Sequence, residues 1–249
     1  MDIDIIEEMK KLKLELYKIQ CKNWIPSLGK GKSASGRTLE ALLGKEEDTD
    51  ALPDYNGIEL KVKSIYSKYD LHLFCCAPDN KPIELQRLLK FGGYPDKNNP
   101  EFKVFQVSIN AINKKQVRRF SYQLFVNHKK EVLELRVFYG LSNNIYTKMS
   151  WTFKELESRL NHKLKYLAII PVIKNKLNGK EYFKYRNPSF YRLKNFNTFI
   201  NLIEEGKIVV TFKLSYYHSG KRYGKFLDRG TNFDIPYNYI ADLFEKLEV

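Results

Sequence analysis

The sequence predicts an α/β fold in which a mixed β-sheet is flanked by helices. Three observations lead to this prediction. The chain opens with an amphipathic helical stripe, short apolar runs with strand character follow, and further helical segments separate those runs. Strands and helices that alternate along a chain are typical of α/β proteins. The 249 residues, 43% of them hydrophobic, are enough to bury a substantial core.

The N-terminal segment is predicted to be a helix capped by Asp2 or Asp4. Its apolar residues recur at steps of three and four and form one stripe, made of Ile5, Met9, Leu12, Leu16 and Ile19. A glycine- and serine-rich stretch follows, and it is predicted to be a loop that carries Lys30, Lys32 and Arg37. Such a loop is either a flexible connector or a basic loop that contacts phosphate, and both interpretations stay open.

The remaining elements alternate strand and helix patterns. Residues 71–76 are predicted to form a buried strand beside the strand at 57–63, and residues 85–89 a short helix. Residues 118–126 and 131–139 are predicted to form a hairpin. The later elements are a helix through 156–160, a strand at 165–173 paired with 179–187, a helix at 196–203 that stops at Gly206, a strand at 208–215 and a last helix from about 237.

The stretch from residue 36 to residue 63 carries the candidate chemistry. A short helical segment holds Glu40, and an acidic, turn-rich loop ends in Asp54 directly after a proline. The strand that follows holds Glu59 and Lys61, which point the same way because side chains on a strand alternate between its faces. Three carboxylates and one lysine are therefore expected near one end of this strand.

This set of side chains suits the hydrolysis of a phosphodiester. The reaction needs a cation to offset charge in the transition state and a correctly oriented water. Mg²⁺ prefers hard oxygen ligands, so we expect Asp54 and Glu59, with the Leu60 carbonyl, to bind one or two Mg²⁺ ions. Lys61 is expected to position the attacking water, and Glu40 to serve as a further ligand or as a base.

The acid-x-lysine triplet alone is weak evidence. It recurs in this chain at Glu8/Lys10, Asp79/Lys81, Glu101/Lys103 and Glu205/Lys207. A half-exposed edge strand with solvated charges is the alternative interpretation of Glu59 and Lys61. The strand pattern, the preceding Pro-Asp turn and the helix that bears Glu40 are what distinguish this copy from the others.

The formal net charge of +14 and the sequence pI near 9.4 favour a polyanionic partner. A general solubility effect is the alternative. Three cysteines without a CxxC pair indicate neither a disulfide framework nor a zinc site. No signal peptide and no long apolar run is present in the sequence, so we expect a cytoplasmic protein that does not enter a membrane.

A basic turn near the C-terminus is the candidate for DNA recognition. It joins two strand patterns, and its alternative interpretation is an exposed hairpin tip with solvated charges. Candidates for phosphate contacts are Lys221, Arg222 and Lys225, and candidates for reading base edges are His218, Arg229 and Asn232. Arginine can pair guanine bidentately and asparagine can pair adenine, which is why these residue types suit base reading.

Four segments together resemble the PD-(D/E)xK nucleases, and more narrowly their MutH-like branch with the MvaI/BcnI restriction endonucleases. The segments are GRTLEALLGKEED, PDYNGIELK, KLKYLAII followed by a lysine- and tyrosine-rich strand, and YYHSGKRYGKFLDRGTNF. The resemblance implies a PD-(D/E)xK core in which Glu40, Asp54, Glu59 and Lys61 are catalytic.

The resemblance also implies a type II restriction endonuclease with two lobes around a DNA cleft. Residues 1–165 would form the catalytic lobe and residues 166–249 the recognition lobe, with the lobes interleaved. Magnesium-dependent cleavage of double-stranded DNA would leave 5′-phosphates, and a monomer would nick the two strands in turn. A cognate DNA methyltransferase is expected in the same system, without a stable complex.

The chain departs from its apparent relatives inside the basic turn. Relatives carry a histidine and an arginine at two positions that are Leu227 and Asp234 here, so the resemblance does not extend to the recognised base sequence. Two other functions stay open: a MutH-like mismatch-repair nicking endonuclease, and a catalytically inactive, sequence-specific DNA-binding protein. The four filled catalytic positions argue against the inactive protein.

Overall fold

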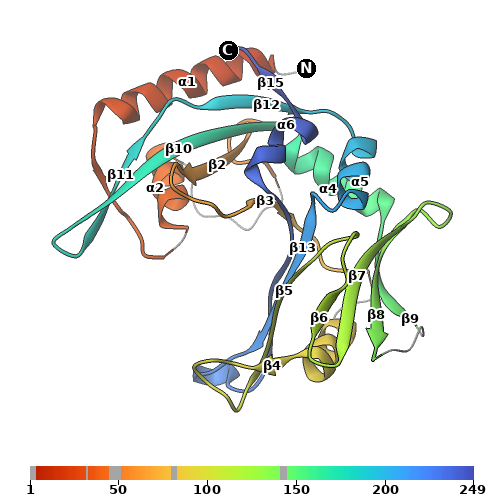
Figure 1. Ribbon diagram of the computed structural model, residues 1–249. Helices are drawn as coiled ribbons and strands as arrows, with labels where there is room; N and C mark the ends of the chain where they lie inside the picture. The colour runs from red at the N-terminus through yellow and green to blue at the C-terminus, as the bar shows by residue number, and fades with distance from the viewer. Residues whose placement is uncertain (1–3, 32, 45–51, 80–82, 141–144) are drawn as a thin grey trace. The chain divides into compact units, whose positions relative to one another are not determined.

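The computed structural model describes residues 4–31, 33–44, 52–79, 83–140 and 145–249 (Figure 1). The chain divides into two compact units that are interleaved in sequence. Unit 1 comprises Met1–Tyr69, Arg159–Lys194 and Leu243–Val249, and unit 2 comprises Asp70–Ser158 and Asn195–Asp242. The boundaries of these units differ from those of the predicted lobes, residues 1–165 and 166–249. The assignment of catalysis and recognition to those two ranges stays a prediction.

Unit 1 begins with the predicted N-terminal helix, α1 (Ile5–Cys21). The Asp4 side chain caps it by accepting a hydrogen bond from the Ile6 backbone N–H at 3.2 Å. The unit also contains α2 (Ala34–Leu42) and the C-terminal part of α4 (Phe153–Leu164). Because α2 begins at Ala34, Arg37 lies on a helix and not on the predicted loop.

The sheet of unit 1 is six-stranded and mixed, as the sequence predicts. Its strands are β1 (Ile25–Pro26), β2 (Glu59–Ser64), β10 (Tyr166–Leu177), β11 (Lys180–Tyr185), β12 (Ser189–Leu193) and β15 (Phe244–Leu247). Strand β10 is its centre, because it pairs in parallel with β2 and antiparallel with both β11 and β12. The prediction that residues 71–76 lie beside the strand at 57–63 is wrong, because β2 pairs with β10 instead.

The apolar stripe of α1 packs against this sheet. The core cluster joins Met9, Leu12, Leu16 and Ile19 of α1 with buried residues of the sheet, among them Leu60, Ala168, Ile170, Val172 and Phe183. Leu60 therefore faces α1. Because strand side chains alternate, Glu59 and Lys61 on either side of Leu60 point to the opposite face of the sheet.

Unit 2 contains two sheets. The five-stranded sheet has the order β3 (Leu71–Cys75), β14 (Phe226–Ile235), β13 (Val209–Tyr216), β5 (Lys103–Ile109) and β4 (Tyr94–Pro95). The four-stranded sheet has the order β6 (Lys115–Val117), β7 (Phe120–Asn127), β8 (Val132–Tyr139) and β9 (Ile145–Thr152). The predicted hairpin at 118–139 is confirmed as β7 and β8.

The helical elements of unit 2 are short. Besides the first part of α4, they are α3 (Ile83–Arg87), the π-helix η1 (Leu88–Gly92), α5 (Phe196–Glu204), the 3-10 turns η2 (Gly220–Arg222) and η3 (Tyr237–Tyr239), and α6 (Ile240–Leu243), which ends in unit 1. Helix α5 ends before Gly206, whose φ of +71° suits glycine at this position. The predicted last helix from residue 237 is wrong in part, because η3 and α6 are followed by strand β15.

Aromatic rings fill the core of unit 2. Phe74 and Phe233 stack with ring centroids 4.9 Å apart, and Phe199 lies against both rings. The Trp151 indole N–H donates to the buried Cys76 carbonyl at 2.9 Å. Among the helices that the structure describes, none has the length and apolar character needed to cross a membrane.

Candidate active site

The turn before β2 sets the position of Asp54. Tyr55 and Ile58 exchange backbone hydrogen bonds of 2.9 and 2.7 Å. Asn56 and Gly57 between them adopt left-handed backbone, with φ of 39° and 86°, which glycine and asparagine tolerate better than other residues. The Asn56 amide also donates to a Glu8 carboxylate oxygen of α1 at 2.6 Å. The turn is thereby fixed to the core helix of the same unit.

Asp54 is held against the start of β2. Its Oδ2 accepts a hydrogen bond from the Leu60 backbone N–H at 3.1 Å. Asp54 also lies close enough to Glu59 for its negative charge to raise the pKa of the Glu59 carboxyl. The structure therefore brings together the two predicted metal-binding carboxylates.

Glu59 and Lys61 form a contact pair on the face of the sheet away from α1. The Lys61 ammonium lies 2.6 Å from Glu59 Oε1, and the two side chains are 17% and 2% exposed. The prediction that they share one face of the strand is confirmed. The alternative interpretation, in which the charges of this strand are solvated, is wrong for Glu59, because its side chain is buried, although β2 has β10 as its one partner among the described strands.

A second lysine joins this pair from a distant segment of the chain. Lys163, near the end of α4, has its ammonium 3.6 Å from Glu59 Oε1. The chain enters β10 directly after α4, and Leu167 of β10 is the register partner of Glu59. The sequence analysis missed Lys163, although the lysine lies in the KLKYLAII segment. The parallel pairing of β10 with β2 brings Lys163 to Glu59, and this pairing is known only from the structure.

Burial dominates the electrostatics of Glu59. It raises the pKa of the Glu59 carboxyl, and the charge of Asp54 raises it further, while Lys61 and Lys163 act in the opposite direction. Glu59 Oε2 is buried and has no hydrogen-bond partner among the described residues. A buried carboxylate oxygen without a partner costs free energy unless a proton or a cation satisfies it.

These residues fit a hard divalent cation. Two carboxylates and the Leu60 carbonyl offer oxygen ligands only, and Mg²⁺ is commonly bound by one or two carboxylates while it keeps several waters. Within the described parts of the chain, no three His, Cys, Asp or Glu side chains gather closely enough to hold a metal ion. Asp54 and Glu59 are the two carboxylates at the start of β2 that would hold such an ion.

Glu40 lies on α2 and is partly buried. Its negative charge contributes to the raised pKa of Tyr185, which burial raises most. Tyr185 of β11 is the register partner of Val172, and Val172 is in turn level with Ser64 at the far end of β2. The role of Glu40 as a further ligand or base stays a prediction.

The basic residues after α1 are only partly described. Lys30 is exposed on the loop, and its carbonyl accepts a hydrogen bond of 2.7 Å from the Arg37 guanidinium. Lys32 lies outside the described residues. The structure thus brings Lys30 and Arg37 together, and the guanidinium orders the loop.

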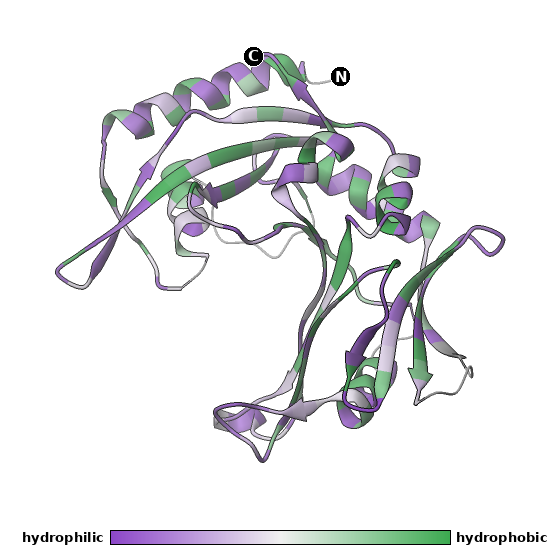
Figure 2. Cartoon of the chain, in the orientation of Figure 1, coloured by the Kyte–Doolittle hydropathy of each residue, from purple (hydrophilic) through white to green (hydrophobic). Residues whose placement is uncertain are grey.

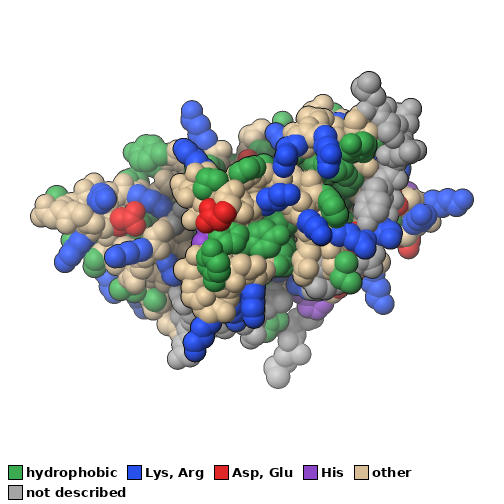
Figure 3. Space-filling view, turned by 90° about the horizontal axis from the view of Figure 1, so that it is seen from below, with side chains coloured by type: hydrophobic (Ala, Val, Ile, Leu, Met, Phe, Trp, Pro, Cys, Tyr) green, Lys and Arg blue, Asp and Glu red, His purple; other side chains and the backbone are tan. Residues whose placement is uncertain are grey.

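The C-terminal basic turn is a closed loop at the end of β13. Tyr217 pairs with Lys225 and Gly224 through backbone hydrogen bonds of 3.0 and 2.8 Å. The Arg222 guanidinium donates to the Tyr217 hydroxyl at 3.1 Å. Lys221, Arg222 and Lys225 are all exposed, as contacts to phosphate require. Figure 3 shows a face on which Lys and Arg side chains outnumber the acidic ones.

The candidates for base reading differ in their exposure. Arg229 is exposed on β14. His218 stacks on Phe102 with ring centroids 5.0 Å apart, and its Nδ1 lies 2.9 Å from the Asn99 amide. Asn232 is 4% exposed and its Oδ1 lies 3.0 Å from the Cys75 thiol. Asn232 could therefore reach a base only after a rearrangement of β14.

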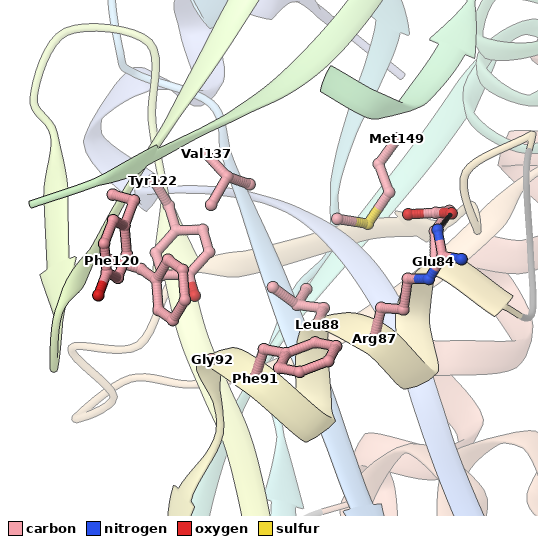
Figure 4. Close-up of a pocket in the computed structure, with 10 residues that line it drawn as sticks. Glu84, Arg87, Leu88, Phe91, Gly92, Phe120, Tyr122, Val137 and Met149 are labelled. Atoms are coloured by element: carbon pink, nitrogen blue, oxygen red, sulfur yellow. Dashed lines mark hydrogen bonds and ion pairs between the residues drawn. The ribbon is translucent and has the colours of Figure 1, made fainter. Parts of the chain in front are cut away.

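A cavity of about 620 Å³ lies in unit 2, apart from the residues described above (Figure 4). Its walls are mainly apolar, with Leu88, Phe91 and Tyr122 among them, and the ion pair of Glu84 with Arg87, 2.8 Å long, lies at one end. The candidate catalytic residues all belong to unit 1, so this cavity is not the site of the proposed chemistry.

Comparisons with known proteins identify the family of the chain. Residues 13–244 match the model of the MvaI/BcnI restriction endonuclease family. The structure is similar to that of restriction endonuclease MvaI in complex with its cognate DNA substrate, with a TM-score of 0.88, 28% sequence identity and coverage of 97% of this chain and 98% of that one.

It is also similar to MvaI in the absence of DNA, with a TM-score of 0.61, 24% identity and 97% coverage of each chain. A comparison with curated protein sequences finds no match. The family match over nearly the whole chain and the shared α/β fold show that this protein belongs to the MvaI/BcnI restriction endonuclease family and is a site-specific DNA endonuclease.

Proposed function

We propose that the protein is a type II restriction endonuclease that hydrolyses phosphodiester bonds of double-stranded DNA with Mg²⁺ and leaves 5′-phosphates. The observation that carries the proposal is the cluster of Asp54, Glu59, Lys61 and Lys163 at the start of β2. The family match supports the reaction class. The DNA complex of the related MvaI supports duplex DNA as the substrate.

Asp54, Glu59 and the Leu60 carbonyl would hold one or two Mg²⁺ ions, with Glu40 as a further ligand or base. When bound, the ion supplies positive charge that offsets the charge developing on the phosphate oxygens. The unpartnered Glu59 Oε2 is the atom of this site that most needs a cation.

Lys61 orients the attacking water in this proposal. Its ammonium is held 2.6 Å from Glu59 Oε1, which leaves its other N–H groups able to donate to the water and to a phosphate oxygen. The water oxygen forms a bond to phosphorus, and the bond from phosphorus to the 3′-oxygen breaks. The phosphate therefore stays attached to the 5′-oxygen. The attacking water loses a proton to solvent, and the leaving 3′-oxygen takes up a proton.

Lys163 acts through Glu59. Its ammonium, 3.6 Å from Glu59 Oε1, lowers the pKa of a carboxyl that burial would otherwise protonate more readily. Lys163 is therefore a positioning residue that keeps Glu59 ionised and aimed at the site.

Binding of the duplex is assigned to two basic regions, the C-terminal turn with β14 and the segment from residue 30 to residue 37. Lys221, Arg222 and Lys225 contact phosphates and Arg229 reads a base edge, with His218 and Asn232 as further readers. Lys30, Lys32 and Arg37 are assigned to contacts with phosphate. The protein acts as a monomer that nicks each strand in turn, in the cytoplasm, alongside a separate DNA methyltransferase.

The test is a plasmid digest with purified wild-type protein and the Asp54→Ala variant. Wild type with Mg²⁺ and no other protein is expected to cut at defined positions, and sequencing the ends would map the site. Chelation of Mg²⁺ and Asp54→Ala should each abolish cutting, while the variant still binds the mapped site.

Three outcomes would contradict the proposal. A wild-type protein that leaves naked plasmid intact but nicks it with added partner proteins would be a MutH-like nicking endonuclease. A protein that binds one site and never cuts would be an inactive DNA-binding protein. Equal cutting by Asp54→Ala would refute the assignment of the site.

A further inference from the structure

Strands β10 and β11 continue as a hairpin beyond the rest of their sheet (Figure 1). Their ladder runs from the pair Val172 and Tyr185 to the pair Leu177 and Lys180. On the other edge of β10, pairing with β2 ends at Val172. On the other edge of β11, β1 pairs only with Phe183 and Tyr182. Among the described residues, the outer half of the hairpin therefore has no neighbouring strand.

The outer hairpin buries little. Residues 174–180 are all exposed, and Figure 2 shows a hydrophilic tip that gives way to apolar residues within the sheet. An isolated two-stranded hairpin is marginally stable in water, so this extension adds little to the stability of the core. Its length calls for an explanation outside the core.

The turn makes this extension stiff. Asn178 and Gly179 both adopt positive φ, 50° and 77°, the backbone of a type I′ turn whose twist matches that of the flanking strands. The hairpin is therefore a well-formed ribbon that holds its side chains in a fixed alternation, and not a loose loop.

Positive charge dominates the ribbon. It carries Lys174, Lys176, Lys180 and Lys184 against the single carboxylate of Glu181. In the part of the chain that the structure describes, none of the four lysines forms an ion pair. The Lys174 ammonium lies over the Phe183 ring, 5.7 Å from its centroid. Because no carboxylate among the described residues neutralises these ammonium groups, they are available to an anionic partner.

The lysines lie on both faces of the ribbon. Residues opposite each other in an antiparallel ladder share a face. The pairs Lys174 with Phe183 and Lys176 with Glu181 lie on one face, and the pairs Leu177 with Lys180 and Ile173 with Lys184 lie on the other. Cations on both faces suit an element that lies between two rows of phosphates, as a groove of duplex DNA presents them.

We propose that the β10–β11 hairpin is a DNA-binding arm that enters a groove of the duplex and contacts the phosphates on its two sides through these lysines. The inference rests on the proposed function for the choice of duplex DNA as the partner. A two-stranded β-ribbon is slender enough for the major groove. Lysine is a flexible point charge, so the arm adds affinity for any sequence and does not read bases.

The experiment measures DNA binding by the full chain in an Asp54→Ala background, with chelator present so that no cutting occurs. The test variant adds Lys176→Ala and Lys180→Ala, one lysine from each face. The matched control adds Lys18→Ala and Lys246→Ala, two exposed lysines on α1 and β15 of the same unit. Affinity is measured over a series of salt concentrations for an arbitrary duplex and for one with the mapped site.

Each phosphate contact contributes about 0.9 to the slope of log affinity against log salt. The hairpin variant is therefore expected to lower that slope by about 2, and by the same amount on both duplexes. The control should leave the slope unchanged, and circular dichroism should show that both variants are folded.

Three results would overturn the inference while the proposed function stands: a slope that the hairpin variant leaves unchanged, an equal fall in the control variant, or a loss confined to the duplex with the mapped site. An unchanged slope would mean that the ribbon binds another acidic partner or no partner. A parent protein that binds no duplex at all would refute the proposed function together with this inference.

Discussion

Glu59 is the side chain on which the proposed chemistry converges. Asp54 and Glu59 bring two negative charges to the start of β2, and Lys61 and Lys163 bring two positive ones. The cluster is therefore balanced, although Glu59 Oε2 stays buried without a partner among the described residues. A divalent cation added to this balanced set leaves an excess positive charge, which favours the extra negative charge of a phosphodiester under attack.

Lys163 offers a test at the scale of one residue. Lys163→Ala is expected to lower the cleavage rate by about 10- to 100-fold, as the loss of a group that orients a metal ligand commonly does. Because Lys163 helps to keep the Glu59 carboxyl ionised as a metal ligand, the Mg²⁺ concentration at half-maximal rate should rise. The measurement is the cleavage rate over a Mg²⁺ titration.

Two variants control this experiment. Lys163→Arg keeps the charge and should recover most of the rate. Lys165→Ala removes an exposed lysine just beyond α4 and should cut like wild type. A Lys163→Ala protein with the wild-type rate and Mg²⁺ dependence would show that the lysine has no part in the site.

Residues close together in sequence were predictable, and distant ones were not. Asp54, Glu59 and Lys61 lie within one turn and one strand, so the alternation of strand side chains was enough to group them. Lys163 reaches Glu59 only because β10 pairs with β2 in parallel, which no local pattern reveals. The burial of Asn232 against Cys75 likewise depends on the pairing of β14 with β3.

At the scale of elements, α1 supports the active-site strand from behind. Leu12 of α1 is fully buried in the cluster that contains Leu60, whereas Leu14 on the same helix is 63% exposed. Leu12→Ala is therefore expected to lower the free energy of unfolding by about 2–5 kcal/mol. Leu14→Ala should change it by less than about 0.5 kcal/mol.

Denaturant unfolding of both variants checks this prediction. Similar losses in the two proteins would mean that the stripe of α1 is not the face that packs on the sheet. This stripe could be predicted because helical spacing is a local signal.

The partner of β2 and the end of the chain could not be predicted in the same way. Residues 71–75 follow β2 closely, and strands that are neighbours in sequence often pair. Residues 71–75 nevertheless belong to unit 2 and pair with β14. The C-terminal residues form a strand beside β12 and not a continued helix. Both outcomes depend on which sheet edges the rest of the chain leaves available.

At the scale of the whole molecule, net charge governs binding to DNA. The chain carries 43 Lys and Arg against 29 Asp and Glu, a formal net charge of +14. Proteins that make 6–10 phosphate contacts lose about 10³- to 10⁵-fold in affinity between roughly 50 and 200 mM salt. We expect a loss of this size for binding to an arbitrary duplex, measured by fluorescence anisotropy. A loss below about tenfold would mean that few phosphates are contacted.

The central claim is that Glu59 belongs to a metal-dependent site and is not one of several similar surface pairs. Glu205 has the same acid-x-lysine spacing and pairs with Lys207 at 2.8 Å, but it is 53% exposed, so it is a matched control. The most direct measurement compares plasmid cleavage with Mg²⁺ by Glu59→Gln, Glu205→Gln and wild type. Glu59→Gln should cut about 10³-fold more slowly or not at all, while Glu205→Gln cuts like wild type. Cutting by Glu59→Gln at the wild-type rate would contradict the account.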